Sequence, residues 1–204
     1  MGWQHLRKNI RVVTMNTQKR TREWLQRFQH AVKRLTAEAQ QMRFDWAAVL
    51  AMRSAKLHPS NLFLQTAAGA LQSDVMIRLI RVLEDSRDTA SFWYLNRCKP
   101  DCVGSGVDIQ WLKDFSGRLK KIRDRVFVHI DKNDVFQPEQ VYANANISIA
   151  EANDEIKRAI ESIWSALKQI HRNQEGSTAA PNADQSLESL AEDFKRDLRK
   201  LIDL

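Results

Sequence analysis

The stretch that decides the fold covers residues 18–53 and reads QKRTREWLQRFQHAVKRLTAEAQQMRFDWAAVLAMR. Its apolar residues recur at alternating steps of three and four, which is the spacing of one face of an α-helix. They are Leu25, Phe28, Val32, Leu35, Ala39, Met42, Trp46 and Val49. The stretch therefore predicts one long amphipathic helix, and its apolar face needs partners from elsewhere in the chain.

Periodic patterns further along predict the helices that supply those partners. We expect them over residues of about 61–85, 89–97, 109–131 and 149–172, with Asp108 as the N-cap of the third. The helix over 61–85 is apolar on several sides, which is typical of a helix in the middle of a bundle. Its small residues 67–70 would let a neighbouring backbone approach closely. Only residues 140–148 could hold a short extended segment, so the expected fold is an all-α bundle of long antiparallel helices.

The pattern divides the chain into four parts. We expect a basic N-terminal extension over residues 1–17, the bundle over 18–173, a small polar linker over 174–184, and a C-terminal amphipathic helix over 185–204. The apolar stripe of the last helix fits two arrangements: it folds back on the bundle, or it docks on a second copy or another protein. Translation could begin at Met1 or at Met15.

Composition narrows the class of protein. Hydrophobic residues make up 43% and charged residues 28%, a globular balance. No run of about 18 apolar residues could span a membrane, and no signal peptide is recognisable, so we expect a cytoplasmic protein. Cys98 and Cys102, the two cysteines, are expected to stay as thiols because no second Cys/His pair completes a zinc site.

The charge is positive, at a formal +7, and is concentrated near the N-terminus. A net positive charge of this size favours acidic partners, of which nucleic acids are the most common. Glu23 is the only acidic residue among the first 34, which hold nine basic ones: Arg7, Lys8, Arg11, Lys19, Arg20, Arg22, Arg27, Lys33 and Arg34. This segment is either a solvated helix face or a surface that contacts RNA or an antitoxin protein.

One segment, residues 120–132 (KKIRDRVFVHIDK), holds the candidate chemistry. Metalloprotease, Walker and serine-hydrolase motifs are missing from the sequence, and we expect neither a metal nor a cofactor. The apolar stripe of the preceding helix (Leu112, Phe115, Leu119, Ile122, Val126) leads to His129. A histidine in that position is either a hydrogen-bonded core residue or a proton-transfer group.

The run Arg123-Asp124-x4-His129 resembles the signature of the HEPN superfamily, an arginine usually followed by a polar residue, with a histidine four to six positions after it. The wider text of residues 121–132 and the helix over 77–85 are similar to the U2-type abortive-infection branch. In helix order the resemblance covers about residues 20–172. It implies a HEPN-like helical bundle.

The resemblance also implies an activity, that of a metal-independent endoribonuclease of the toxin or phage-defence type. Such proteins are often homodimers in which two copies of the motif meet at the two-fold axis. By the family's pattern His129 would handle the proton of the ribose 2′-OH or of the leaving oxygen, and Arg123 would hold the scissile phosphate. Asp124 would orient one of them. We expect the neighbouring cations to bind RNA: Lys120, Lys121, Arg125 and Lys132.

Two other functions remain open at this point. The chain could be a non-catalytic HEPN-like helical module that binds RNA or a partner protein through its basic N-terminal face. It could also be a helical toxin that an antitoxin neutralises by binding the C-terminal helix. On an ideal helix Arg123 and His129 lie about 120° apart. Their convergence therefore needs a distortion, the reach of the arginine, or a dimer.

Overall fold

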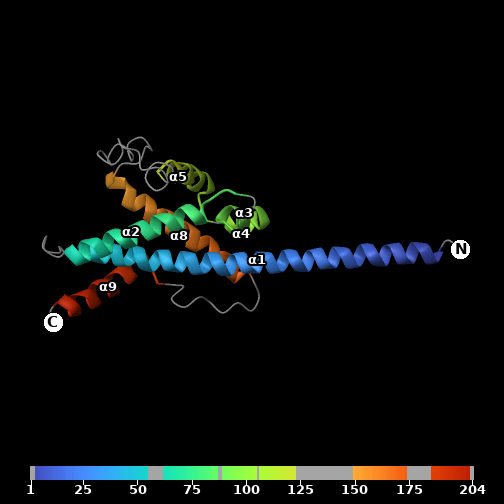
Figure 1. Cartoon of the computed structure of the whole chain (residues 1–204), viewed down its shortest axis with the longest axis horizontal. Coiled ribbons are helices and arrows are strands. Elements are labelled where there is room, and N and C mark those ends of the chain that lie inside the picture. The colour runs from blue at the N-terminus through green and yellow to red at the C-terminus, as the bar shows by residue number, and fades with distance from the viewer. Residues whose placement is uncertain are drawn as a thin grey trace.

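Helices make up all the regular structure in the described part of the chain (Figure 1). The computed structural model describes residues 3–54, 62–86, 89–104, 106–122, 149–173 and 185–202. No strand occurs among these residues, which confirms the all-α prediction; the possible extended segment over 140–148 and the linker over 174–184 lie outside them. The helices are α1 (Trp3–Ser54), α2 (Leu62–Val82), α3 (Phe92–Cys98), α4 (Pro100–Val103), α5 (Ile109–Ile122), α8 (Ile149–Arg172) and α9 (Leu187–Ile202).

Helix α1 is the axis of the bundle and packs against α2, α3, α8 and α9. At 52 residues it is about 78 Å long, and Figure 1 shows its N-terminal part extending away from the other helices. It begins at Trp3, earlier than the position near residue 18 that the apolar seam predicts. Because extending a formed helix costs little and no glycine or proline intervenes, the helix continues past the end of its apolar stripe.

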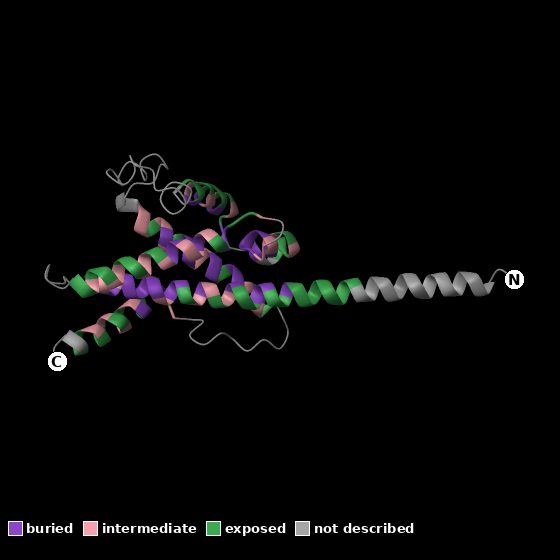
Figure 2. Cartoon of the chain, viewed as in Figure 1, coloured by how far each residue is buried: buried purple, intermediate pink, exposed green. Residues whose placement is uncertain are grey.

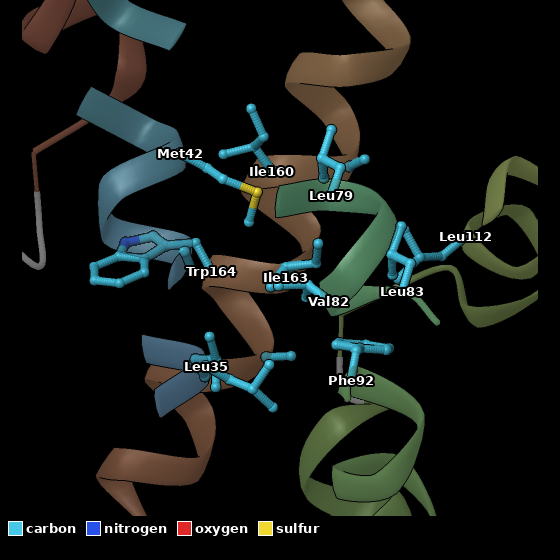
Figure 3. Close-up of a cluster of buried hydrophobic side chains, with 14 of the residues drawn as sticks. Leu35, Met42, Leu79, Val82, Leu83, Phe92, Leu112, Ile160, Ile163 and Trp164 are labelled. Atoms are coloured by element: carbon cyan, nitrogen blue, oxygen red, sulfur yellow. The ribbon is translucent and has the colours of Figure 1, made fainter. Parts of the chain in front are cut away.

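The core lies between α1, α2 and α8. Every predicted seam residue of α1 is buried except Leu25, which is 46% exposed. Figure 3 shows Met42 of α1 and Leu79 of α2 on either side of Ile160 of α8, and Trp164 of α8 belongs to the same cluster. Burial of one such aliphatic side chain stabilises the fold by about 1.5–3 kcal/mol.

Helix α2 differs from its prediction. Its C-terminal half is buried, but at its start Leu62 is 72% exposed and Phe63 is 79% exposed. A side chain added at Gly69 would meet no atom within 4 Å, so the small residues serve no close helix approach in this chain. The buried residues of α2 are Val75, Met76, Leu79 and Val82, so the helix joins the core through its C-terminal half.

Helix α9 folds back on α1, which is one of the two arrangements open from the sequence. Leu187 and Leu190 are buried. The buried guanidinium of Arg43 on α1 donates one hydrogen bond to the Gln185 carbonyl just before α9 and another to Glu161 Oε1 of α8, at 3.3 Å. It also lies 4.7 Å from the centre of the Trp164 ring. Arg43 therefore joins α1, α8 and α9.

Candidate functional site

Helix α5 leads into the segment that carries the predicted chemistry. Its start is as predicted, because Asp108 Oδ1 accepts a hydrogen bond from the Trp111 backbone N–H at 3.0 Å and so caps the helix. The predicted inward stripe is confirmed where the structure describes it: Leu112, Phe115 and Leu119 are buried. The part of the predicted helix after Ile122 lies outside the described residues.

Two ion pairs fix α5 to α8. Arg118 Nη2 lies 2.5 Å from Glu155 Oε1, and both side chains are mostly buried. Asp108 pairs with Arg158 at 3.2 Å, and the Arg158 guanidinium stacks 4.0 Å from the centre of the Trp111 ring. The Arg118–Glu155 pair is shielded from water, and such a pair depends strongly on correct geometry. The Asp108–Arg158 pair is more than half exposed and contributes less.

A single carbonyl connects α5 to α2 and α3. The Leu83 carbonyl oxygen, at the end of α2, accepts a hydrogen bond from Trp93 Nε1 at 2.7 Å and one from Ser116 Oγ at 2.8 Å. The carbonyls at the end of a helix lack partners within the helix, and here two side chains supply them. Trp93 and its neighbour Phe92 are buried, so these two aromatic side chains pack the short helix α3 against the bundle.

A pocket of about 270 Å³ lies beside this junction. Its charged lining residues are Lys113 and Lys120 from α5, with Glu84 and Asp85 from the end of α2. Two carboxylates against two ammonium groups leave no excess positive charge, so this pocket does not favour a phosphate.

The structure describes two of the predicted site residues. Lys120 and Lys121 are exposed in the last turn of α5, and Lys120 borders the pocket just described. The other predicted residues lie outside the described part of the chain: Arg123, Asp124, Arg125, His129 and Lys132. Their mutual geometry therefore stays a prediction.

The basic stretch of α1, which we define as residues 20–34, is exposed along its cationic side (Figure 2). Arg20, Arg22, Arg27, Lys33 and Arg34 are all exposed, and Glu23 is the only carboxylate in the stretch. None of these five cations forms an ion pair within the described residues. This surface can therefore attract a polyanion.

His171 joins α8 to α1. Its Nε2 lies 2.9 Å from Thr36 Oγ1, and the Thr36 hydroxyl donates to the Val32 carbonyl. The imidazole must then be the donor in the first bond, and burial lowers the pKa of His171. Within the described residues, no group of three or more His, Cys, Asp or Glu side chains could hold a metal ion.

Sequence reasoning missed that Thr89 and Tyr94 lie against the basic stretch of α1, where they line one pocket with Arg27 and Arg34. No local pattern signals a contact between residues so far apart in the chain. None of the helices in the described ranges is both long and apolar enough to cross a membrane.

Comparisons of the chain with models of protein families, with characterised proteins and with solved structures gave no match.

Proposed function

We propose that the chain is a metal-independent endoribonuclease of the HEPN type, with a toxin or phage-defence role, that acts as a homodimer. The observation that carries the proposal is the sequence Arg123-Asp124-x4-His129, which begins one residue after α5 ends at Ile122. Helix α5 is anchored by its buried stripe, by two ion pairs to α8 and by the Leu83 junction. Such anchoring is what a site needs in the element that precedes it.

The proposed reaction uses the substrate's own ribose. His129 takes the proton of the 2′-OH, or gives one to the leaving 5′-oxygen, while Arg123 holds the scissile phosphate as negative charge develops on it. Asp124 orients one of the two side chains. The 2′-oxygen attacks phosphorus, the bond to the 5′-oxygen breaks, and the products are a 2′,3′-cyclic phosphate and a 5′-hydroxyl. DNA lacks this nucleophile and is not a substrate.

The surface charge supports RNA as the partner. Lys120 and Lys121 are exposed at the end of α5, and the basic stretch of α1 provides a larger cationic face. With Arg125 and Lys132 these residues would hold the backbone on both sides of the cut.

Cleavage of a mixed RNA pool in EDTA tests the proposal. Wild-type protein should release fragments with cyclic phosphate ends, and Arg123→Ala or His129→Ala should lower the rate by at least about 100-fold. His171→Gln is the matched control, because it removes a histidine whose contacts lie within the bundle, and it should cut at the wild-type rate. Equal cutting by wild type and His129→Ala would overturn the assignment.

The basic stretch of α1 favours a second candidate, a non-catalytic helical module that binds RNA. This surface lies on α1, far from the motif in sequence, and does not need it. RNA retention that weakens with salt, without cutting by any variant, would support the module.

A protein antitoxin is a further partner to test: induced expression should arrest bacterial growth with wild-type protein and not with His129→Ala.

A further inference from the structure

A pocket of about 510 Å³ lies between α1 and the start of α3. Arg27, His30, Ala31 and Arg34 line it from α1, and Thr89, Ala90 and Tyr94 line it from the other side. On α1 the polar lining residues follow one another at steps of three and four, so their side chains lie on one face within about two turns. Three cationic or ionisable nitrogen groups therefore point into one concave surface.

The lining of this pocket holds no carboxylate. Two acidic residues near these segments in sequence are engaged elsewhere: Glu38 pairs with Arg78 of α2, and Asp85 pairs with Arg97 of α3. Glu23, one turn before Arg27, does not line the pocket, and Asp88 lies outside the described residues. Arg27 and Arg34 are exposed and form no ion pair within the described ranges. The pocket therefore keeps a net positive charge, unlike the pocket beside Lys120.

Tyr94 adds a neutral donor. Burial raises the pKa of Tyr94 and the Cys98 thiol raises it further, while Arg27 acts in the opposite direction. The hydroxyl therefore stays protonated at neutral pH, and the guanidinium of Arg27 lies close enough to influence it. Phosphate oxygens accept hydrogen bonds and carry negative charge, so both kinds of group suit a phosphate.

An exposed aromatic side chain lies one turn before Arg27. Trp24 stacks on Phe28 with ring centres 5.6 Å apart and a 14° angle between planes. Phe28 is buried, whereas Trp24 is 40% exposed. A base can stack on such a ring. An aromatic platform beside cations is typical of a site for single-stranded nucleic acid and is not required for an acidic peptide.

We propose that this pocket holds a backbone phosphate of single-stranded RNA through Arg27, Arg34 and Tyr94, and that Trp24 stacks on a neighbouring base. The site rests on the RNA-binding part of the proposed function. It does not involve residues 123–132, so it would position the RNA on α1 whether or not the chain cuts it.

The test measures binding of the full chain to a fluorescent single-stranded RNA in which every ribose carries a 2′-O-methyl group and cannot be cut. The variant Arg27→Gln/Arg34→Gln should weaken binding about tenfold at low salt. It should also flatten the slope of log K against log salt by about 0.7, since the two arginines hold one phosphate and each phosphate contact on a single strand contributes about 0.7. The matched control Arg172→Gln/Arg199→Gln removes the same charge from exposed sites on α8 and α9, and it should leave both quantities near the wild-type values.

A second pair of variants tests the stacking contact. Trp24→Ala should weaken binding about fivefold without changing the salt slope, because stacking releases no counterions. Leu25→Ala truncates an equally exposed neighbour and should have no effect. Circular dichroism and thermal unfolding of each variant check that the fold is intact.

Three results would overturn the site: equal weakening by the two double variants, no weakening by either, or displacement of the RNA by AMP or an acidic peptide at equal concentration. The assay separates this site from the catalytic proposal. If ordinary RNA is cut and Arg27→Gln/Arg34→Gln does not change RNA binding, the proposed phosphate site is wrong and the catalytic proposal stands. If Arg27→Gln/Arg34→Gln weakens RNA binding but no RNA is cut, the phosphate site stands and the catalytic proposal is wrong.

Discussion

Asp45 is a buried carboxylate in a layer of apolar side chains. Gln41 Nε2 donates to it at 2.8 Å. Burial still raises the pKa of Asp45, the Gln41 hydrogen bond opposes that shift, and the charge of Asp74 adds to it. A raised pKa means that the folded state holds the ionised form less well than the unfolded chain does. At neutral pH the charge of Asp45 therefore lowers the free energy of unfolding.

Asp45→Asn should stabilise the protein at pH 7, by about 1 kcal/mol, because it removes the buried charge and keeps an oxygen that accepts from Gln41. The gain should be complete at neutral pH, shrink as the pH falls through the folded pKa, and vanish only below the unfolded value of 3.8, where the wild-type carboxyl becomes protonated in both states. Urea unfolding of wild type and Asp45→Asn at pH 7 and pH 4 measures the difference in their free energies of unfolding. A gain of the same size at both pH values would contradict this explanation.

His171 gives the opposite pH dependence. Burial lowers its pKa below the ordinary 6.5, so the unfolded chain takes up a proton more readily than the folded one. The contribution of the neutral imidazole is fully present above pH 6.5 and is lost as the pH falls toward the folded pKa. His171→Gln keeps a donor for Thr36 and should unfold with less change between pH 7.5 and pH 5.5 than wild type, as guanidinium titrations at both pH values can show.

At the scale of the element, the attachment of α9 depends on one side chain. Arg43 contacts Glu161 and the Gln185 carbonyl, across 118 and 142 residues of sequence. Its guanidinium is buried, so an uncharged replacement leaves the Gln185 carbonyl without this donor, whereas Glu161 is 38% exposed and stays partly hydrated. Lys157 of α8 and Glu188 of α9 form a second, more exposed pair, which is worth far less.

Arg43→Met should therefore lower the free energy of unfolding by about 2 kcal/mol, because it removes hydrogen bonds from a charged group, and it should loosen α9 first. Hydrogen exchange of the α9 amides should accelerate more than that of α8, since α8 retains its packing on α1 and α5. Arg53→Met is the control: Arg53 is exposed and bonds to Asn153 and Gln72, and its loss should cost about 0.5 kcal/mol. Uniform acceleration across all helices would show that Arg43 supports the whole core and not α9 in particular.

The elements also show how far sequence reasoning reaches. The apolar seam of α1 and the bounds of α8 follow from periodicity, and the start of α5 follows from its Asp108 cap. The early start of α1 leaves no apolar signal, because a helix can extend through polar residues. The exposure of Leu62 and Phe63 depends on how far neighbouring helices reach, and the pocket at Tyr94 depends on a contact between distant segments. Neither property is local, so neither could be predicted from the sequence pattern.

At the scale of the whole molecule, the proposed homodimer can be tested by mixing subunits that carry two different inactivating substitutions. If each active site takes Arg123 from one subunit and His129 from the other, a dimer of one Arg123→Ala and one His129→Ala subunit contains one intact site. Co-expression of the two inactive variants at equal levels should then restore about a quarter of the wild-type sites, because half of the dimers are mixed. No recovery in verified mixed dimers would place both side chains of each site in the same subunit.

The contact between α1 and α9 joins helices from opposite ends of the described chain. As the chain leaves the ribosome, α1 appears before α9, and its buried residues around Arg43 have no α9 to cover them until more than 142 further residues have been joined. Domains generally acquire structure in the order of synthesis, and bare apolar surface invites aggregation or chaperone binding. The growing chain must therefore stay soluble with its central helix partly uncovered, and the many charges on the rest of α1 are well suited to keep it so.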